Sequence, residues 1–481
     1  MKKILLFLMI GLGLSSCKNW LDINYNPNSP TDVSADLVFP QAQLSLFINY
    51  GGELHNYGSF FVQYFDQAPG AQQYYNLASY NVRSGWLDRS YTDLYRDGGN
   101  SAQYVIENTD EDGTYYAAVI IKAFIIQTMT DAMGDAPYAE AFNAKEFPQP
   151  KYDDGKTIYA GLLAEIAAAE AQLTANPMMT TNDLLFGGDF EKWRQFGNAL
   201  KLRLYMRQVP NFENDVKAKV QALIAEDGFP NGDVMATFWT DESGKRNPWQ
   251  ATNMDYFSGN NHILSYAFVT SSQDDRMDGF ANPAKSSGVH VGGVPVNNKS
   301  TSDAIGNYST LMKNFSAPVY LITLAEIDFF KAEAAYRWGT KADAQAAYEE
   351  GIENAFAIWG TPGAAASYGL GGSYRWADAS PGDGLKLIAL QKWLSLAGVN
   401  GFEAWCEQRR FTIPSFGATA ELVLASGSNY TLNTLIVPGG VSQNGTKGVG
   451  RFFYPDVSND VNNNTPARKD INAPLFWMPQ Q

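Results

Sequence analysis

The sequence predicts a mainly all-α protein. Apolar residues recur at helical spacing over much of the chain, whereas the alternating pattern of long strands is scarce. Hydrophobic residues make up 45% and charged residues 18% of the 481 positions, which is enough apolar material for a large core. The segments with a helical period are 36–50, 115–133, 155–174, 189–207, 213–226, 319–338, 341–358, 384–398 and 401–409.

The predicted helices are separated by long polar stretches and include one candidate repeat unit. Gly, Asn, Ser and Pro are frequent between 227 and 315 and again from 412 onward, so we expect a loop-rich, irregular part of the fold there. After Gly339, the residues Ala344, Tyr348 and Gly351 alternate small and large side chains at helical spacing. That pattern resembles the turn and second helix of a tetratricopeptide unit, and equally suits any helical hairpin.

The N-terminus has the pattern of a bacterial lipoprotein signal peptide. Two lysines precede an apolar run from Ile4 to Leu14, which is too short to span a bilayer, and the run ends in Leu-Ser-Ser-Cys at residues 14–17. Cleavage before Cys17 would leave a cysteine that carries acyl chains such as palmitate. An ordinary secretory signal with a chance cysteine is the alternative.

Residues 17–35 are rich in Asn, Asp and Pro and predict an extended tether. Asp22, Asn24 and Asn26 imitate the start of a calcium loop, but Pro27 and Val33 stand where that loop needs Gly and Glu. The predicted organisation is a signal peptide (1–16), a tether (17–35) and one domain (36–481).

Composition argues against several classes of function. With 35 Lys and Arg against 50 Asp and Glu, the net charge is −15, which disfavours a nucleic-acid partner. Two cysteines and three scattered histidines offer little for a disulfide framework, a zinc or haem site, or a Ser-His-Asp triad. We therefore expect no cofactor, no metal and no enzymatic activity.

Two polar constellations have a catalytic and a structural interpretation. Asp131 and Asp135 could form the carboxylate pair of a glycoside hydrolase, or mark a helix end that Gly134 breaks, with Asp135 accepting hydrogen bonds from nearby backbone amides. Glu403, Glu407, Arg409 and Arg410 share a short predicted helix with Trp405, where buried Arg–Glu pairing is favoured over catalysis. Cys406 is expected to be a small core residue.

Aromatic residues supply the candidate ligand-binding positions. The chain has 11 Trp, 26 Tyr and 28 Phe, and two clusters fall in polar, irregular stretches. A ring exposed on a loop can stack on a sugar or hold a peptide side chain, and the alternative is that it caps the core beneath its loop. The residues chosen as ligand-binding candidates are Tyr74, Tyr75, Trp86, Trp249 and Tyr256.

Several segments together resemble the SusD/RagB family, in particular its second SusD-like branch. Each segment is weak evidence alone, but they occur in the family's order behind a lipoprotein signal. They are Leu14-Ser15-Ser16-Cys17, Asn-Pro-Asn-Ser-Pro at 26–30, Thr130-Asp131 with Gly134-Asp135-Ala136-Pro137-Tyr138, Pro150-Lys151-Tyr152-Asp153, Trp193 with Asn198-Ala199-Leu200-Lys201-Leu202-Arg203, Ala325-Glu326 with Lys331-Ala332-Glu333-Ala334, Gln391-Lys392-Trp393, Gly401-Phe402-Glu403-Ala404-Trp405 with Arg409-Arg410, and Arg451 with Tyr454-Pro455.

The resemblance implies a helical fold of four tetratricopeptide-like helix pairs with an irregular half that carries the ligand site. It implies a surface-exposed lipoprotein of the outer membrane that binds oligosaccharides, without chemistry, and delivers them to a TonB-dependent, SusC-like transporter. The alternatives are a peptide-binding RagB-like lipoprotein, an all-α glycoside hydrolase, and a structural lipoprotein with no small ligand. The shared motifs lie in the predicted helical scaffold, so they assign no pocket residue.

Overall fold

The computed structural model describes nine stretches of the chain. They are residues 33–68, 73–251, 257–259, 274–292, 305–361, 375–376, 383–419, 434–437 and 447–480. The predicted signal peptide, Cys17, most of the tether and Tyr256 lie outside the described residues.

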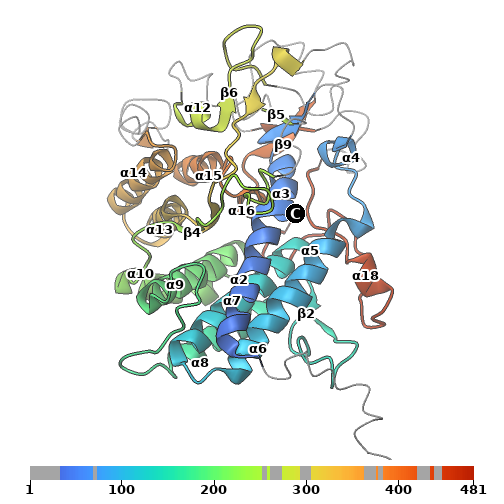
Figure 1. The fold of residues 1–481 in the computed structure, drawn as a ribbon. Helices are drawn as coiled ribbons and strands as arrows, with labels where there is room; N and C mark the ends of the chain where they lie inside the picture. The colour runs from blue at the N-terminus through green and yellow to red at the C-terminus, as the bar shows by residue number, and fades with distance from the viewer. Residues whose placement is uncertain are drawn as a thin grey trace, which may run out of the picture.

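The described chain is predominantly helical, as predicted (Figure 1). The long predicted helices are present with small shifts of their ends, apart from the start of the segment 319–338. They are α2 (Ala35–Asn49), α7 (Asp112–Met133), α8 (Gly155–Glu170), α9 (Phe190–Arg207), α10 (Val209–Glu226), α13 (Leu324–Trp338), α14 (Lys341–Ala357), α15 (Gly384–Ser395) and α16 (Gly401–Phe411).

The helical prediction for 319–338 is wrong at its start. Residues Val319–Ile322 form strand β8, which pairs antiparallel with β4 (Val234–Ala236). This run of β-branched, aromatic and aliphatic residues suits a strand. The helix begins afterwards, because the Thr323 side chain accepts a hydrogen bond from the Glu326 amide and so caps α13.

Several short helical segments were not predicted, most of them between residues 50 and 108. Glycines and polar residues interrupt the apolar pattern there, so part of this stretch was expected to be irregular. The additional helical segments are η2 (Tyr50–Leu54), α3 (His55–Phe61), α4 (Tyr75–Ala78), η3 (Ser84–Leu87), α5 (Asp88–Asp93), η4 (Leu94–Gly99), α6 (Asn100–Asn108), α12 (Arg276–Phe280), η6 (Ile305–Asn307) and α18 (Asp456–Asn459).

The strands of the described residues are short. The largest sheet has the order β1-β5-β7-β6, β2 pairs with β3, and β9 pairs in parallel with β10. Their bounds are β1 (Phe65–Gln67), β2 (Ala136–Pro137), β3 (Tyr152–Asp153), β5 (Phe257–Gly259), β6 (Ala281–Asn282), β7 (Thr310–Leu311), β9 (Ser415–Thr419) and β10 (Thr434–Val437).

Consecutive helices pack in four pairs, the arrangement that the family resemblance implied. The pairs are α7 with α8, α9 with α10, α13 with α14, and α15 with α16. In the α13–α14 hairpin, a Cβ added to Gly351 would press against the Phe329 ring, and Tyr348 packs beside the same ring. The small residue therefore permits the close approach of the two helices, and the large one fills the space next to it.

Helix α7 lies at the centre of the core. Among the described residues it is long and apolar enough to cross a membrane, yet 94% of its most apolar window is buried within the protein. Burial against neighbouring helices accounts for this composition. Helix α7 ends at Met133, because Gly134 adopts a φ of +90°, which confirms the predicted helix end.

A network of buried charges joins five helices. Arg207 of α9 contacts the carboxylates of Asp131 (3.4 Å), Glu403 (2.6 Å) and Glu407. The network continues through Arg203–Glu326, Lys392–Glu407 and Arg410–Glu333, and the side chains of all these residues are almost completely buried. Burial disfavours ionisation of Glu407, but the attraction of Arg410, Lys392 and Arg207 outweighs it and lowers the pKa of that carboxyl.

We expect Arg207→Met to lower the free energy of unfolding by roughly 3–5 kcal/mol, because it leaves buried carboxylates without their cation. The matched control is Arg194→Met on the same helix, whose guanidinium is partly exposed and pairs with Glu191. That change should cost about 1 kcal/mol or less. Urea unfolding of both variants measures the difference, and equal losses would contradict the role given to the network.

Candidate functional site

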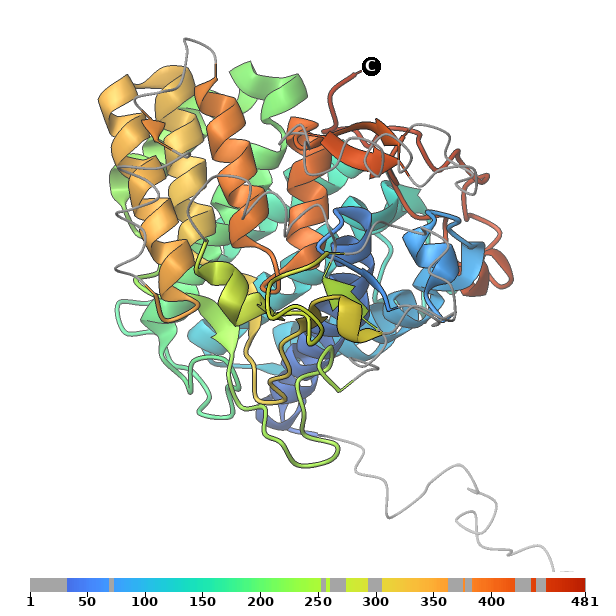
Figure 2. The same cartoon turned by 90° about the horizontal axis from the view of Figure 1, so that it is seen from above.

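Two segments far apart in the sequence meet on one side of the molecule. Residues 73–87 lie against the C-terminal stretch 447–480, and both views place α4 beside the C-terminal chain (Figures 1 and 2). The Ser84 hydroxyl donates to the Asp456 carboxylate (2.9 Å), and the Tyr80 ring packs edge-on against Phe416 of β9 at 5.9 Å. We call the surface formed by residues 73–87, β9 and 447–480 the ring face.

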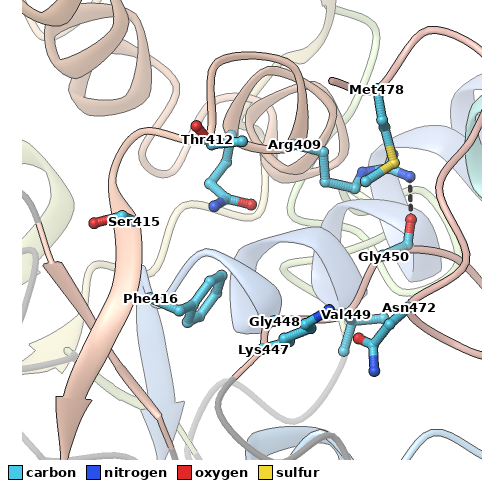
Figure 3. A pocket seen from close by; sticks show the side chains of 11 residues that line it. Arg409, Thr412, Ser415, Phe416, Lys447, Gly448, Val449, Gly450, Asn472 and Met478 are labelled. Carbon is cyan, nitrogen blue, oxygen red and sulfur yellow. Dashed lines mark hydrogen bonds between the residues drawn. The ribbon is translucent and has the colours of Figure 1, made fainter. Parts of the chain in front are cut away.

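The ring face contains two hollows. The first, of about 190 Å³, is shown in Figure 3 and is lined by Gln408, Arg409, Thr412, Ser415, Phe416, Lys447, Gly448, Val449, Gly450, Asn472 and Met478. The second, of about 390 Å³, is lined by Tyr80, Val82, Phe453, Arg468, Lys469, Asp470 and Ile471. The contact between Tyr80 and Phe416 joins the linings of the two hollows.

The first hollow combines one ring with several polar groups. Phe416 can lie over Gly448 because that residue has no Cβ, which would overlap the ring. Arg409 is buried beneath the hollow and donates hydrogen bonds to the carbonyls of Gly450 (2.9 Å) and Asp131 (2.9 Å), the former drawn in Figure 3. The hollow therefore offers an apolar ring, neutral hydrogen-bonding groups and positive charge together.

The second hollow has a basic wall. The Arg468 guanidinium lies 3.6 Å from the centre of the Phe453 ring, a cation–π arrangement. Lys469 pairs with Asp135 (2.6 Å), which also accepts a hydrogen bond from the Tyr454 hydroxyl (3.0 Å). Partial burial favours the neutral amine, but the bond to Asp135 raises the pKa of Lys469. Asp135 is therefore bonded to the side chains of Lys469 and Tyr454. The prediction that it accepts hydrogen bonds from nearby backbone amides is wrong.

Three predicted ligand-binding residues lie on the ring face. Trp86 in η3 stacks on Tyr57 with the ring centres 5.8 Å apart and the planes 12° apart. Tyr74 packs against Phe60 at 5.6 Å, and Tyr75 is the first residue of α4. All three rings are half-buried, so part of each remains accessible.

Trp249 has a different environment from the other candidates. It is 6% exposed, stacks on Phe65 at 5.4 Å and packs against His55 at 4.7 Å. Burial lowers the pKa of His55 to about 3, and its Nδ1 accepts a hydrogen bond from the Gly401 amide. In this structure Trp249 is therefore a core ring, and the successive contacts of Phe65 and Phe60 connect it to Tyr74.

The carboxylates considered for hydrolysis are engaged with other groups. Asp131 is fully buried and accepts hydrogen bonds from Tyr159 (2.5 Å) and the Trp477 indole (2.9 Å), while Asp135 pairs with Lys469. This arrangement does not present the two carboxylates to a shared ligand. Within the described stretches, no group of three or more His, Cys, Asp or Glu is placed to hold a metal ion.

The interpretation of 401–411 as a helix with buried Arg–Glu pairing is confirmed for Arg410, Glu403 and Glu407. Arg409 differs, because its hydrogen bonds go to backbone carbonyls and to the Cys406 sulfur. Cys406 is a core residue, as predicted, and burial raises the pKa of its thiol to about 12.

Sequence reasoning missed several residues of the ring face. Phe416, Lys447 and Arg468 were not predicted, because the chain from 412 onward has the composition of a polar loop. Tyr57 of α3, on which the ring-face residue Trp86 stacks, was not predicted either. Aromatic residues at 452–454 and adjacent basic residues at 468–469, in an acidic chain, were the available signal.

Comparison with known proteins decides the family. Residues 27–430 match the SusD-like_2 family, described as starch-binding and associating with the outer membrane. The chain belongs to this SusD-like family. The predicted resemblance is thereby confirmed, and members of the family are binding proteins rather than enzymes.

Solved SusD-like structures share the fold at low sequence identity. A chitin-binding protein superposes with a TM-score of 0.75 at 19% identity, covering 92% of this chain and 100% of its own. A chitin-binding SusD homolog from Flavobacterium johnsoniae gives 0.72 at 20% identity (91% and 98% covered). A SusD homolog from Bacteroides uniformis gives 0.73 at 21% identity (93% and 100% covered). The search of curated proteins gives no match.

We expect Trp249→Ala to lower the free energy of unfolding by roughly 3–5 kcal/mol, because it removes a large buried ring. Tyr75→Ala, at a half-buried ring, should cost about 1 kcal/mol or less. Denaturant unfolding of the two variants tests the distinction. If Trp249→Ala is as stable as the wild type, Trp249 is not a core ring and is again a candidate ligand-binding residue.

Proposed function

We propose that the protein is a lipid-anchored lipoprotein of the outer membrane that binds oligosaccharides on its surface-exposed ring face. Cys17 carries the acyl chains, palmitate among them, and residues 17–35 form the tether. The bound glycan is delivered to a SusC-like, TonB-dependent transporter. The family's description as starch-binding, and the two solved relatives described as chitin-binding, support a glycan as the ligand.

One observation carries the placement of the site. Trp86 stacks on Tyr57 with part of its ring accessible, in the segment whose Tyr80 and Val82 line the 390 Å³ hollow. Sugars bind proteins by laying their C–H faces on such rings while their hydroxyls form hydrogen bonds to polar groups. The volume is within the range of about 300–1,000 Å³ that is usual for ligand sites.

The neighbouring contacts favour binding over a purely structural role for these residues. Tyr57 is fixed by its hydroxyl, which donates to Glu53 (3.0 Å), and by the contact of its ring with Phe452 at 5.4 Å. A ring held from below provides a rigid platform for Trp86, so little side-chain entropy is lost when a ligand stacks on it. Tyr74 and Tyr75 extend the aromatic surface from the same segment.

We expect Trp86→Ala to weaken glycan binding about ten-fold or more, a loss of about 1.4 kcal/mol, while circular dichroism shows the fold retained. Calorimetric titration of the mature chain with starch and chitin oligosaccharides, and with a peptide library, gives the measurement. Trp338→Ala is the control, because Trp338 is a half-buried Trp on α13, outside the ring face.

Unchanged glycan affinity of Trp86→Ala would remove the ring face as the binding site. If the protein binds peptides and no glycan, the proposed ligand is wrong and the protein is the peptide-binding, RagB-like alternative.

The anchor has its own test. We expect Cys17→Ser to lack acyl chains by mass spectrometry and to leave the membrane fraction, since anchoring depends on the lipid attached to that sulfur. Wild-type protein should remain with the outer membrane. Protease added to whole cells should degrade it, because it is exposed at the cell surface. A Cys17→Ser protein that still fractionates with membranes would contradict the proposed anchor.

A further inference from the structure

The second hollow of the ring face has a balanced set of charges. Arg468, Lys469 and Asp470 line it, and Lys469 is paired with Asp135 at 2.6 Å. The two cations are therefore matched by two carboxylates. A ligand with a net charge of either sign would meet a like charge as well as an opposite one, so this lining favours a neutral ligand.

Arg468 has hydrogen-bond donors that the protein leaves unused. Its guanidinium lies over the Phe453 ring, 3.6 Å from the ring centre, and this contact holds it in place. Within the described part of the chain it forms no ion pair and no hydrogen bond with another residue, and the side chain is exposed. A guanidinium has several N–H groups and no acceptor, so it is available to donate to an oxygen of a ligand.

Asp470 supplies an acceptor in the same hollow. One of its carboxylate oxygens, Oδ1, accepts a hydrogen bond from the Asn472 amide (2.7 Å), which fixes the side chain in its turn. Its other oxygen, Oδ2, accepts no hydrogen bond from the residues that the structure describes. The hollow therefore presents an unused donor and an unused acceptor, separated in the chain only by the paired Lys469.

The rest of the lining is largely apolar and is held rigidly. Val82 and Ile471 contribute aliphatic side chains, and Tyr80 contributes a buried ring. Tyr80 adopts a φ of +58°, which is uncommon for a bulky residue. Its hydroxyl accepts a hydrogen bond from Gln63 (2.8 Å) and donates one to the Phe61 carbonyl (3.1 Å). These bonds hold Tyr80 in its strained conformation, so this wall is formed before a ligand arrives.

A donor, an acceptor and an aliphatic wall together match the acetamido group of an amino sugar. That group has a carbonyl oxygen that accepts, an N–H that donates and an apolar methyl. A hydroxyl could use the donor and the acceptor, but it would place a polar group against Val82 and Ile471, which costs solvation. A charged amino group would be attracted by Asp470 and repelled by Arg468, and it has no methyl to fill the apolar wall.

We propose that the second hollow binds the acetamido group of an N-acetylated hexosamine. Arg468 donates to the acetamido carbonyl, Asp470 accepts from the acetamido N–H, and the methyl packs against Val82 and Ile471. The adjoining sugar unit lies on Trp86, which belongs to the same segment as Val82. This inference rests on the proposed glycan-binding function and specifies the ligand class of that site.

The test compares oligosaccharides that differ only in the substituent at carbon 2 of each sugar. Series of N-acetylglucosamine, glucosamine and glucose carry an acetamido, an amino and a hydroxyl group there, and the corresponding galactose series is titrated beside them. Calorimetric titration of the mature chain gives the affinities. We expect one acetamido series to bind about ten-fold or more tightly than its amino and hydroxyl counterparts, because it alone uses the donor, the acceptor and the apolar wall together.

Two variants place the acetamido group in the hollow. Arg468→Met removes the donors but keeps an unbranched side chain that can lie on Phe453. Asp470→Asn keeps an oxygen for the Asn472 amide and puts an NH₂ group in place of the second oxygen. We expect each change to reduce the preference for the acetamido series about five-fold or more. Both side chains are exposed, so the thermal midpoint should stay that of the wild type.

Arg246→Met is the matched control. The Arg246 guanidinium also lies over a phenylalanine ring, 4.0 Å from the centre of Phe315, but it belongs to the chain between β4 and β5, outside both hollows. This variant should show the same preference as the wild type.

Several results would overturn the inference. If the hydroxyl series bind at least as tightly as the acetamido series, the acetamido assignment is wrong while glycan binding stands. If the amino series bind most tightly, the hollow selects a cation and the assignment is equally wrong. If the acetamido preference is unchanged in both Arg468→Met and Asp470→Asn, the group is not held in the second hollow. If no glycan of any series binds, the inference and the proposed function both fail.

Discussion

The fold depends on the requirement that buried charges find partners. Arg207 pairs with carboxylates of α7 and α16, and Arg410 of α16 pairs with Glu333 of α13. Helices from the two halves of the chain are thus brought together by groups that would be strongly disfavoured if they were separated. Asp131 also accepts a hydrogen bond from Trp477 near the C-terminus. The same network therefore fixes the C-terminal stretch, which in turn forms one wall of the ring face.

Such a network specifies geometry more than it adds stability, because removing charges from water offsets most of their attraction. The glycines at the helix crossings also specify the geometry of packing. A Cβ on Gly58 or Gly401 would overlap the facing backbone or Ser59, so α3 and α16 can meet closely only without those atoms. Helix α16 is held by charge on one side and by this crossing on the other, and Arg409 and Phe416 are placed at its C-terminal end.

Much of the scaffold follows from the sequence, whereas the site does not. Helical periodicity and caps are local properties, which is why α7, α9 and α14 were predicted with small errors. Buried pairing of Glu407 with arginine was predicted from the charged residues that share its helix, but its partner Arg207 is 200 residues away and has no local signal. The ring face requires that 73–87 meet 447–480, a contact that periodicity cannot encode. Trp249 and Trp86 look alike in sequence, and only packing distinguishes a core ring from a half-exposed one.

The buried scaffold and the ring face differ in the partners of their arginines. Within the network each described guanidinium meets a carboxylate, so its field is largely cancelled at the surface. Arg409 and Arg451 lie at the edge of that network, where carbonyl dipoles replace carboxylates. Dipoles solvate a cation without cancelling its charge, so part of the field extends into the hollow above. The buried scaffold and the surface above it therefore differ in how their arginines are compensated, by carboxylates in the network and by carbonyl dipoles at its edge.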